Sequence, residues 1–186
     1  MPRHPTADAY RIPEMLRDLV LVDMLELTGS TQAAAELLQV SQPTASRRYR
    51  RVANDLGLQS DRCLPPGRRY GDAPWLRLLR RGVNHHRLSS GVLRLGGAAE
   101  LEPLLLPLLP PRLVVQWIRL PMRSLPHRQQ LLEEELLDGL VLRHDELDSA
   151  HCSAAPMQLT LTCAGPLWLL CRPDPVVLAL ARQLLS

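Results

Sequence analysis

The feature that most constrains the fold is a break between two helical patterns within residues 33–57. An Ala- and Leu-rich run ends at Val40, and Ser41-Gln42-Pro43 begins a second run that continues to about Leu56. Ser is a favourable N-cap, and Pro is tolerated in the first helical turn because its missing N–H has no intrahelical partner there. The pattern therefore predicts two short helices joined by a tight turn, which is a helix-turn-helix.

Other elements are expected around this pair. Apolar residues recur at helical spacing from Ile12 to Leu27, Gly29 ends that helix, and Ser30 is a good N-cap for a helix over residues 31–38. Residues 58–72 are rich in Gly, Pro and Arg and are compatible with a short two-stranded wing. A fourth helix is expected from Pro74 to about Leu88, and its apolar residues should share one face: Trp75, Leu76, Leu79 and Val83.

The periodicity changes after Ser89-Ser90-Gly91, where we place a boundary. Residues 92–97, 112–120 and 139–144 are typical of strands, and helical segments separate them. This alternation predicts a βαβαβ unit with parallel strands and right-handed crossovers. Two more strands are expected over residues 157–165 and 166–173, followed by a final helix with Pro175 at its start.

The charge distribution separates the two regions. The chain has 186 residues and a formal net charge of +3, but residues 1–90 carry 14 Arg against 9 acidic residues, and the remainder carries 8 Arg against 10. Aromatic residues make up only 3% of the chain, which argues against base-stacking surfaces of the kind that bind single strands. The basic charge of the chain therefore belongs to its first region.

The helix that begins at Ser41 has the side chains that a DNA-recognition helix requires. Its leading edge carries small or amide side chains that can meet base edges in the major groove, and Gln can pair bidentately with adenine: Ser41, Gln42, Pro43, Thr44 and Ser46. Arginines follow at positions suited to phosphates: Arg47, Arg48, Arg50 and Arg51. Ser30 could present helix amides to a phosphate, and Arg62, Arg68 and Arg69 could hold the flanking backbone.

The same stretch resembles the winged helix-turn-helix of LysR-type transcriptional regulators. The matching residues are Gly29, Ser30, Ala34, Ala35, Leu38, Val40, Ser41, Gln42, Pro43, Ser46, Arg47, Arg51, Leu56 and Gly57. The helix from Pro74 resembles the family's linker helix, through which protomers pair. Departures fall at packing positions, where Thr31 replaces a Phe, Val52-Ala53 replaces a Leu-Glu, and Gln59-Ser60 replaces an apolar pair.

The second region is similar in part to the first lobe of the family's periplasmic-binding-protein-like effector domain, and Asp138 matches its Leu-Asp-leading strand. The resemblance implies an α+β multidomain protein with three parts. These are a winged helix-turn-helix at 12–72, a linker and dimerisation helix at 73–90, and a shortened effector-like α/β domain at 91–186. Because residues 91–186 are too few for two lobes, we expect reduced or absent control by a small-molecule co-inducer.

The other potential site residues have simpler interpretations than a binding or catalytic role. His144, Asp145, Glu146, Asp148, His151 and Cys152 are all potential metal ligands, but their spacing matches no standard site, and a polar loop is the favoured interpretation. His85 and His86 are adjacent and so do not share a helix face. Cys63 is taken as structural. No nucleophile elbow, phosphate-binding loop or dinucleotide fingerprint is present, so no enzyme activity, cofactor or metal is expected.

The sequence thus predicts a cytoplasmic, DNA-binding transcriptional regulator that forms a homodimer or a higher homo-oligomer. No basic-then-apolar leader and no apolar run long enough to span a bilayer are found, so no membrane partner is expected. Two alternatives stay open at this point. One is an interaction protein that does not bind DNA and pairs with a full-length relative, and the other is a metal-responsive regulator.

Overall fold

The computed structural model describes residues 12, 14–105, 107, 109–110, 113–147, 155–161 and 165–184. The fold is α+β, and the chain divides into two compact units. One is Ile12–Asn84, and the described part of the other begins at His85. Among the helices of these residues, none combines the length and the apolar character needed to cross a membrane.

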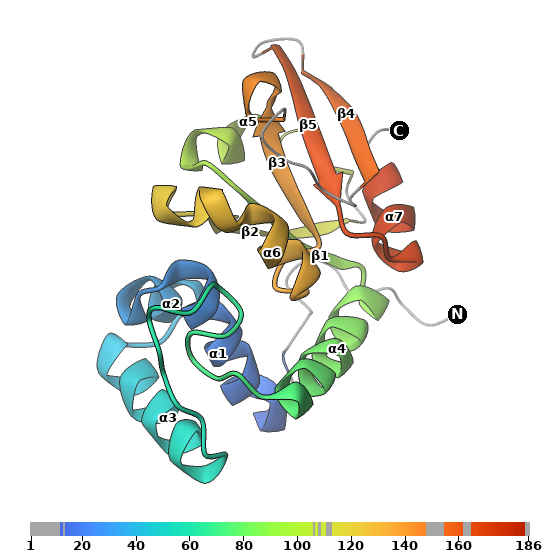
Figure 1. Cartoon of the computed structure of the whole chain (residues 1–186). Coiled ribbons are helices and arrows are strands. Elements are labelled where there is room, and N and C mark those ends of the chain that lie inside the picture. The colour runs from blue at the N-terminus through green and yellow to red at the C-terminus, as the bar shows by residue number, and fades with distance from the viewer. Residues whose placement is uncertain are drawn as a thin grey trace. The chain divides into compact units, whose positions relative to one another are not determined.

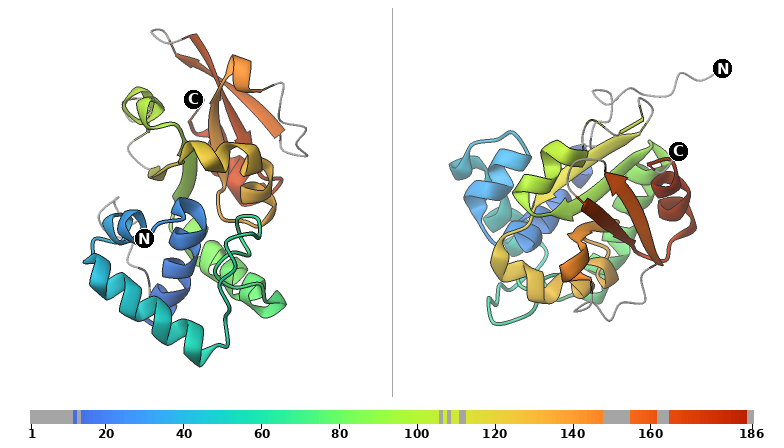
Figure 2. Two further views of the ribbon diagram at one scale, coloured as in Figure 1. Left: turned by 60° about the vertical axis from the view of Figure 1, so that its left-hand side comes forward. Right: turned by 90° about the horizontal axis from the view of Figure 1, so that it is seen from above.

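The first unit is built from helices (Figures 1 and 2). A 3-10 turn, η2 (Glu14–Leu16), leads into α1 (Arg17–Thr28), and α2 (Thr31–Leu37), α3 (Gln42–Asp55) and the first part of α4 (Pro74–Ser89) follow. Helix α1 is the centre of the unit, because every residue from Val20 to Thr28 is buried and it contacts both α2 and α3.

Local capping sets the boundaries of these helices, and α2 and α3 lie where the sequence predicted two helices joined by a tight turn. Gly29 adopts the left-handed conformation at φ 60° and donates its N–H to Leu25 O at 2.8 Å, which ends α1. The Ser30 side chain accepts from Ala33 N, and the Ser41 side chain accepts from Thr44 N at 3.3 Å. Each serine therefore satisfies an N–H that the first helical turn would leave without a partner.

The expected two-stranded wing is not formed. All of residues 58–72 are described, and they contain turns but no strand. Pro65 and Pro66 each lack the N–H that a strand ladder needs, and Gly67 turns the chain at φ 98°. The loop is instead fixed from α1, where Glu26 Oε2 accepts from Gly67 N at 2.8 Å and Oε1 accepts from Tyr70 N at 2.6 Å.

The second unit contains a five-stranded sheet with the order β2-β1-β3-β5-β4 (Figure 1). The strands are β1 (Val92–Gly97), β2 (Val114–Arg119), β3 (Gly139–Arg143), β4 (Ala155–Leu161) and β5 (Gly165–Cys171). Strand β1 pairs in parallel with β2 and β3, which confirms the predicted βαβαβ order, and β5 runs antiparallel to both β3 and β4.

Short helices connect the strands of this sheet or follow the last of them. They are η3 (Ala99–Leu101), α5 (Glu102–Leu105), η5 (Met122–His127), α6 (Arg128–Glu133), η6 (His144–Glu146) and the terminal α7 (Pro175–Arg182). One apolar core joins Leu93 and Leu95 of β1 to Leu105 of α5 and Val177 of α7, so α5 and α7 cover the same face of the sheet. Asp174 caps α7, as the Asp-Pro start of that helix suggests.

Candidate nucleic-acid interface

The start of α3 presents an exposed polar edge. Ser41, Gln42 and Pro43 are exposed, while Thr44 and Ser46 are half-buried. The hydroxyls of Ser41 and Thr44 lie 2.8 Å apart and hydrogen-bond to each other. Within the part of the chain that the structure describes, no group hydrogen-bonds to the Gln42 side chain, so its amide is available for an external partner.

The four arginines of α3 fall into two classes. Arg47 and Arg50 are exposed, and among the described residues no ion pair or hydrogen bond engages either guanidinium. Arg48 and Arg51 instead bind the carboxylate of Asp18 on α1, with Arg48 Nη2 at 2.6 Å from Oδ1 and Arg51 Nη2 at 2.8 Å from Oδ2. A ligand of Arg48 or Arg51, unlike a ligand of Arg47 or Arg50, must compete with Asp18 or bind beside its negative charge.

The Asp18 carboxylate is held in its charged form by these two arginines. Partial burial alone would raise the pKa of Asp18, but the hydrogen bonds from Arg51 and Arg48 and their positive charges outweigh it, so the pKa is lowered. A surface hollow of 260 Å³ is lined by Thr44, Arg47, Arg48 and Arg51. Three of the four lining residues are arginines, so this hollow is a basic recess on the first unit.

The flanking residues proposed for the DNA backbone are arranged unequally. The Ser30 hydroxyl is occupied as the cap of α2. Arg62 is exposed, whereas Arg69 Nε donates to Leu64 O at 2.8 Å and Arg68 Nε lies 4.0 Å from Asp72 Oδ1. Arg69 therefore stabilises the shape of the loop, and Arg62 is its most available cation.

An aromatic contact that the sequence did not suggest ties this loop to α3. Tyr49 donates its hydroxyl to Tyr70 O at 3.2 Å, and the two rings meet edge to face with centroids 5.4 Å apart. With the Glu26 contacts, this gives the loop two anchors, one on α1 and one on α3. The sequence signal for the first anchor was the acidic residue Glu26 within the buried stretch of α1, because a buried carboxylate needs hydrogen-bond donors.

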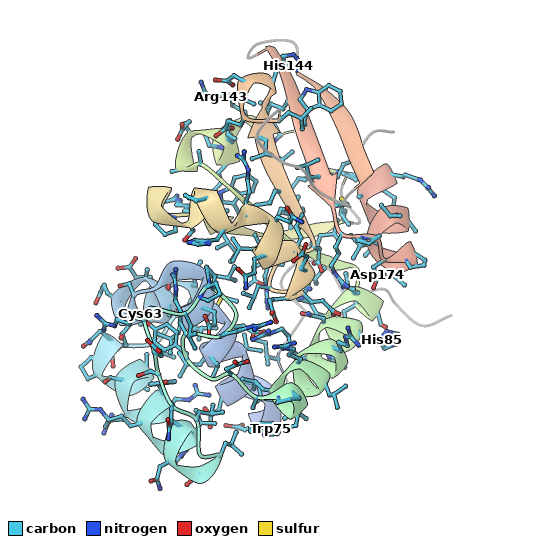
Figure 3. All side chains as sticks on the ribbon, viewed as in Figure 1. Cys63, Trp75, His85, Arg143, His144 and Asp174 are labelled. Atoms are coloured by element: carbon cyan, nitrogen blue, oxygen red, sulfur yellow. The ribbon has the colours of Figure 1, made fainter. Side chains whose placement is uncertain are left out.

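The four apolar residues predicted to share a pairing face on α4 do not share one environment. Leu76 and Val83 are both 3% exposed, so they are buried within the protomer, whereas Trp75 is 38% and Leu79 is 42% exposed. Leu78, at 66%, lies among the exposed residues as well. Leu76 and Val83 therefore pack within the protomer, whereas Trp75, Leu78 and Leu79 stay at the surface, where Figure 3 labels Trp75. The pairing role of the four predicted residues stays a prediction.

The potential metal ligands do not form a site in the residues described. His144 Nδ1 accepts from Trp168 Nε1 at 3.2 Å, and Glu146 accepts from Arg143 N at 2.8 Å, in the region labelled in Figure 3. Asp148, His151 and Cys152 lie outside the described residues. No group of three or more metal-binding side chains occurs in the part that is described.

The remaining candidates show ordinary environments. His85 and His86 are both exposed on α4, and Figure 3 labels His85 and Cys63. Cys63 is an exposed free thiol in the loop. Cys171 is buried in the core of the sheet, where burial raises the pKa of its thiol to about 12 and so disfavours the reactive thiolate.

Comparison with known proteins finds similarity to solved structures alone. No protein-family model matches the sequence, and no curated protein matches it. Solved structures do match. The chain resembles LysR-family transcriptional regulators. HinK of Pseudomonas aeruginosa, described as a LysR family regulator, is 21% identical, with 69% of this chain and 47% of HinK covered at a TM-score of 0.32.

Two further solved structures match with similar identity, coverage and TM-score. OxyR C199D of Pseudomonas aeruginosa is 17% identical, with 71% of this chain and 50% of that one covered at a TM-score of 0.38. The AphB N100E variant is 17% identical, with 78% and 53% covered at a TM-score of 0.45. The present chain thus spans about half the length of the solved structures that it matches.

Proposed function

We propose that this protein is a LysR-type transcriptional regulator that binds double-stranded DNA in a sequence-specific manner. The observation that carries the proposal is the exposed polar start of α3. Within the described residues, it combines the available amide of Gln42 with two unpaired arginines, Arg47 and Arg50. A helix that follows a tight turn and presents such an edge matches the requirements of major-groove recognition.

Each group at this edge has a distinct role in the proposal. Gln42 pairs with a base edge, because its amide can donate and accept at the same time. Arg47 and Arg50 bind phosphates on the sides of the groove, and Arg62 in the loop binds the flanking backbone. Ser41 and Thr44 fix the start of α3 through their mutual hydrogen bond and can also reach the DNA.

Pairing of two protomers belongs to the same proposal. Trp75, Leu78 and Leu79 form an exposed apolar strip on α4, and such a strip is stabilised by burial against a second copy. A homodimer would read two half-sites, so the bound DNA should carry an approximate inverted repeat. We also predict that small molecules change the DNA affinity little. A metabolite that shifts this affinity several-fold would contradict that prediction.

The test is selection of bound duplexes from a random DNA pool by the purified protein. We expect enrichment of a partial palindrome, and we expect Gln42→Ala to lose about 1–3 kcal/mol of discrimination at one base position of each half-site. Gln183→Ala, which changes an exposed glutamine of the other unit, is the matched control and should leave the selected sequence unchanged.

Arg47→Gln and Arg50→Gln should weaken binding to all duplexes alike. The dependence of log K on log salt should become shallower by about 0.9 for each phosphate that the variant no longer neutralises. A protein that enriches no sequence and shows no salt-dependent DNA binding would overturn the proposal.

A further inference from the structure

The carboxylate of Asp18 occupies the hydrogen-bonding edges of two arginines on α3. Its Oδ1 accepts from Arg48 Nε at 2.7 Å and lies 2.6 Å from Arg48 Nη2, while Oδ2 accepts from Arg51 Nη2 at 2.8 Å. Both carboxylate oxygens and one whole edge of Arg48 are therefore in use. Asp18 comes from α1, so these hydrogen bonds join positions 30 and 33 residues apart in the sequence.

These ion pairs reduce the number of guanidinium groups with which α3 can bind a polyanion. The Arg48 and Asp18 side chains are each 24% exposed, and Arg51 is 65% exposed. A phosphate could take the paired edge of Arg48 only by displacing the carboxylate. Arg51 is held through Nη2 alone, so a phosphate would meet it beside the competing negative charge of Asp18. The carboxylate itself repels phosphate, so the three groups together carry one net positive charge instead of two.

We propose that Asp18 is a specificity-determining residue that withholds Arg48 and Arg51 from non-specific phosphate binding. The inference rests on the proposed function, because it concerns how the same helix discriminates among DNA sequences. Non-specific binding depends almost entirely on phosphate neutralisation, whereas specific binding also draws on hydrogen bonds to base edges. In a specific complex the base contacts fix the position of α3, whereas in a non-specific complex the helix can shift to bring any free arginine to a phosphate. Holding back two of the four arginines of α3 therefore weakens binding to random DNA more than binding to the selected sequence.

The test compares the wild-type protein with Asp18→Asn on two duplexes of equal length, the selected operator and a scrambled sequence. Fluorescence anisotropy gives both affinities between about 50 and 200 mM salt. We expect Asp18→Asn to bind the scrambled duplex about tenfold more tightly at the low-salt end. Its salt dependence should steepen by about 0.9 for each released arginine that reaches a phosphate, and the ratio of specific to non-specific affinity should fall.

Two further variants separate the mechanism from a general charge effect. Glu14→Gln removes one acidic charge from the same unit, at a mostly exposed residue that pairs with Arg17 instead of an arginine of α3, and it should leave the salt dependence unchanged. Arg48→Gln should have little effect on the salt dependence in the wild-type background. In the Asp18→Asn background it should make the salt dependence shallower by about 0.9, the value for one phosphate.

The outcomes distinguish this inference from the proposed function. If Asp18→Asn keeps its thermal unfolding transition yet leaves both salt dependences unchanged, or weakens binding to both duplexes, Asp18 is instead a structural residue or an orienter of DNA-binding arginines, and the inference is overturned. Equal effects of Arg48→Gln in both backgrounds would overturn it as well. A wild-type protein that binds neither duplex at low salt would contradict the proposed function, and the inference would fall with it.

Discussion

Substitution of the ion pair between Asp23 and Arg80 is the strongest test of what stabilises the first unit. Arg80 of α4 and Asp23 of α1 are almost completely buried, with side-chain exposures of 2% and 5%, and Arg80 Nε lies 2.7 Å from Asp23 Oδ1. The pair joins helices through positions 57 residues apart in the sequence. We predict that Asp23→Ala is severely destabilising, because it removes this carboxylate from a guanidinium that stays buried.

The expected size follows from the burial of both partners. Breaking a buried pair by removing one member typically costs about 3–5 kcal/mol, because the remaining charge stays desolvated. Whole proteins of this size unfold with about 5–15 kcal/mol, so the loss is a large fraction of the total. For a chain of 150–250 residues, about 2–4 °C is lost per kcal/mol, which gives a decrease in Tm of about 6–20 °C.

The assay is urea unfolding followed by far-UV circular dichroism, with thermal unfolding as a second measurement. Asp55→Ala removes an exposed acid near the end of α3 and is the matched control, with an expected change within about 0.5 kcal/mol. Replacing both members by apolar residues, as in Asp23→Leu with Arg80→Met, should restore part of the lost stability, since no buried charge of this pair remains. The recovery should be partial, because Arg80 also offsets the negative charge of buried Glu26.

Two results would refute this reasoning. A loss below about 1 kcal/mol for Asp23→Ala would mean that Arg80 keeps adequate solvation or other partners without the carboxylate. A double variant as unstable as Asp23→Ala would mean that the uncompensated charge of Arg80 is not the cause of the loss, or that its removal costs as much at Glu26 as it relieves.

Three further predictions concern other parts of the fold. Ser41→Ala should lower the unfolding free energy by about 1 kcal/mol in urea titrations, since Thr44 N loses its acceptor, and a neutral result would contradict the cap. Gly97→Ala should cost about 1–3 kcal/mol in the same assay, because a Cβ there would lie 2.8 Å from the Trp117 ring and 3.0 Å from the carbonyl oxygen of Val141. Burial alone would raise the pKa of Asp138, but the charge and hydrogen bonds of Arg87 outweigh burial and lower the pKa below 3.8. The contribution of Asp138 to stability is therefore present above pH 3.8 and is lost as the pH falls through the folded-state pKa. Unfolding titrations of Asp138→Asn should accordingly show a weaker acid dependence than those of the wild type.

The elements that the sequence predicted well are those set by local chemistry. Gly29, Ser30 and Ser41 act within one turn of the helices that they end or begin, and the structure confirms all three. The strands predicted over 92–97 and 139–144 match β1 and, within one residue, β3, because buried parallel strands are short continuous apolar runs. Capping and periodicity carry this information within a few residues, so no knowledge of tertiary contacts was needed.

The parts that could not be predicted depend on contacts between distant positions. The stretch at 58–72 had wing-like composition, yet its shape follows from Glu26, which binds amides 41 and 44 residues further along the chain. No local sequence pattern indicates which loop a buried carboxylate will bind. The antiparallel placement of β5 between β3 and β4 is of the same kind, because strand order depends on pairing partners and not on the strand's own sequence.

The candidate interface shows why counting charges overstates what a surface can bind. The first 90 residues have a clear excess of arginine, but many of these side chains are committed within the protein. Arg80 pairs with buried Asp23, Arg69 holds its own loop, and Asp18 engages Arg48. Because phosphate affinity depends on guanidinium groups that are free to displace counterions, the number that matters for DNA is set by intramolecular pairing. On α3 that pairing leaves Arg47 and Arg50, two exposed arginines that form no ion pair with any of the described residues.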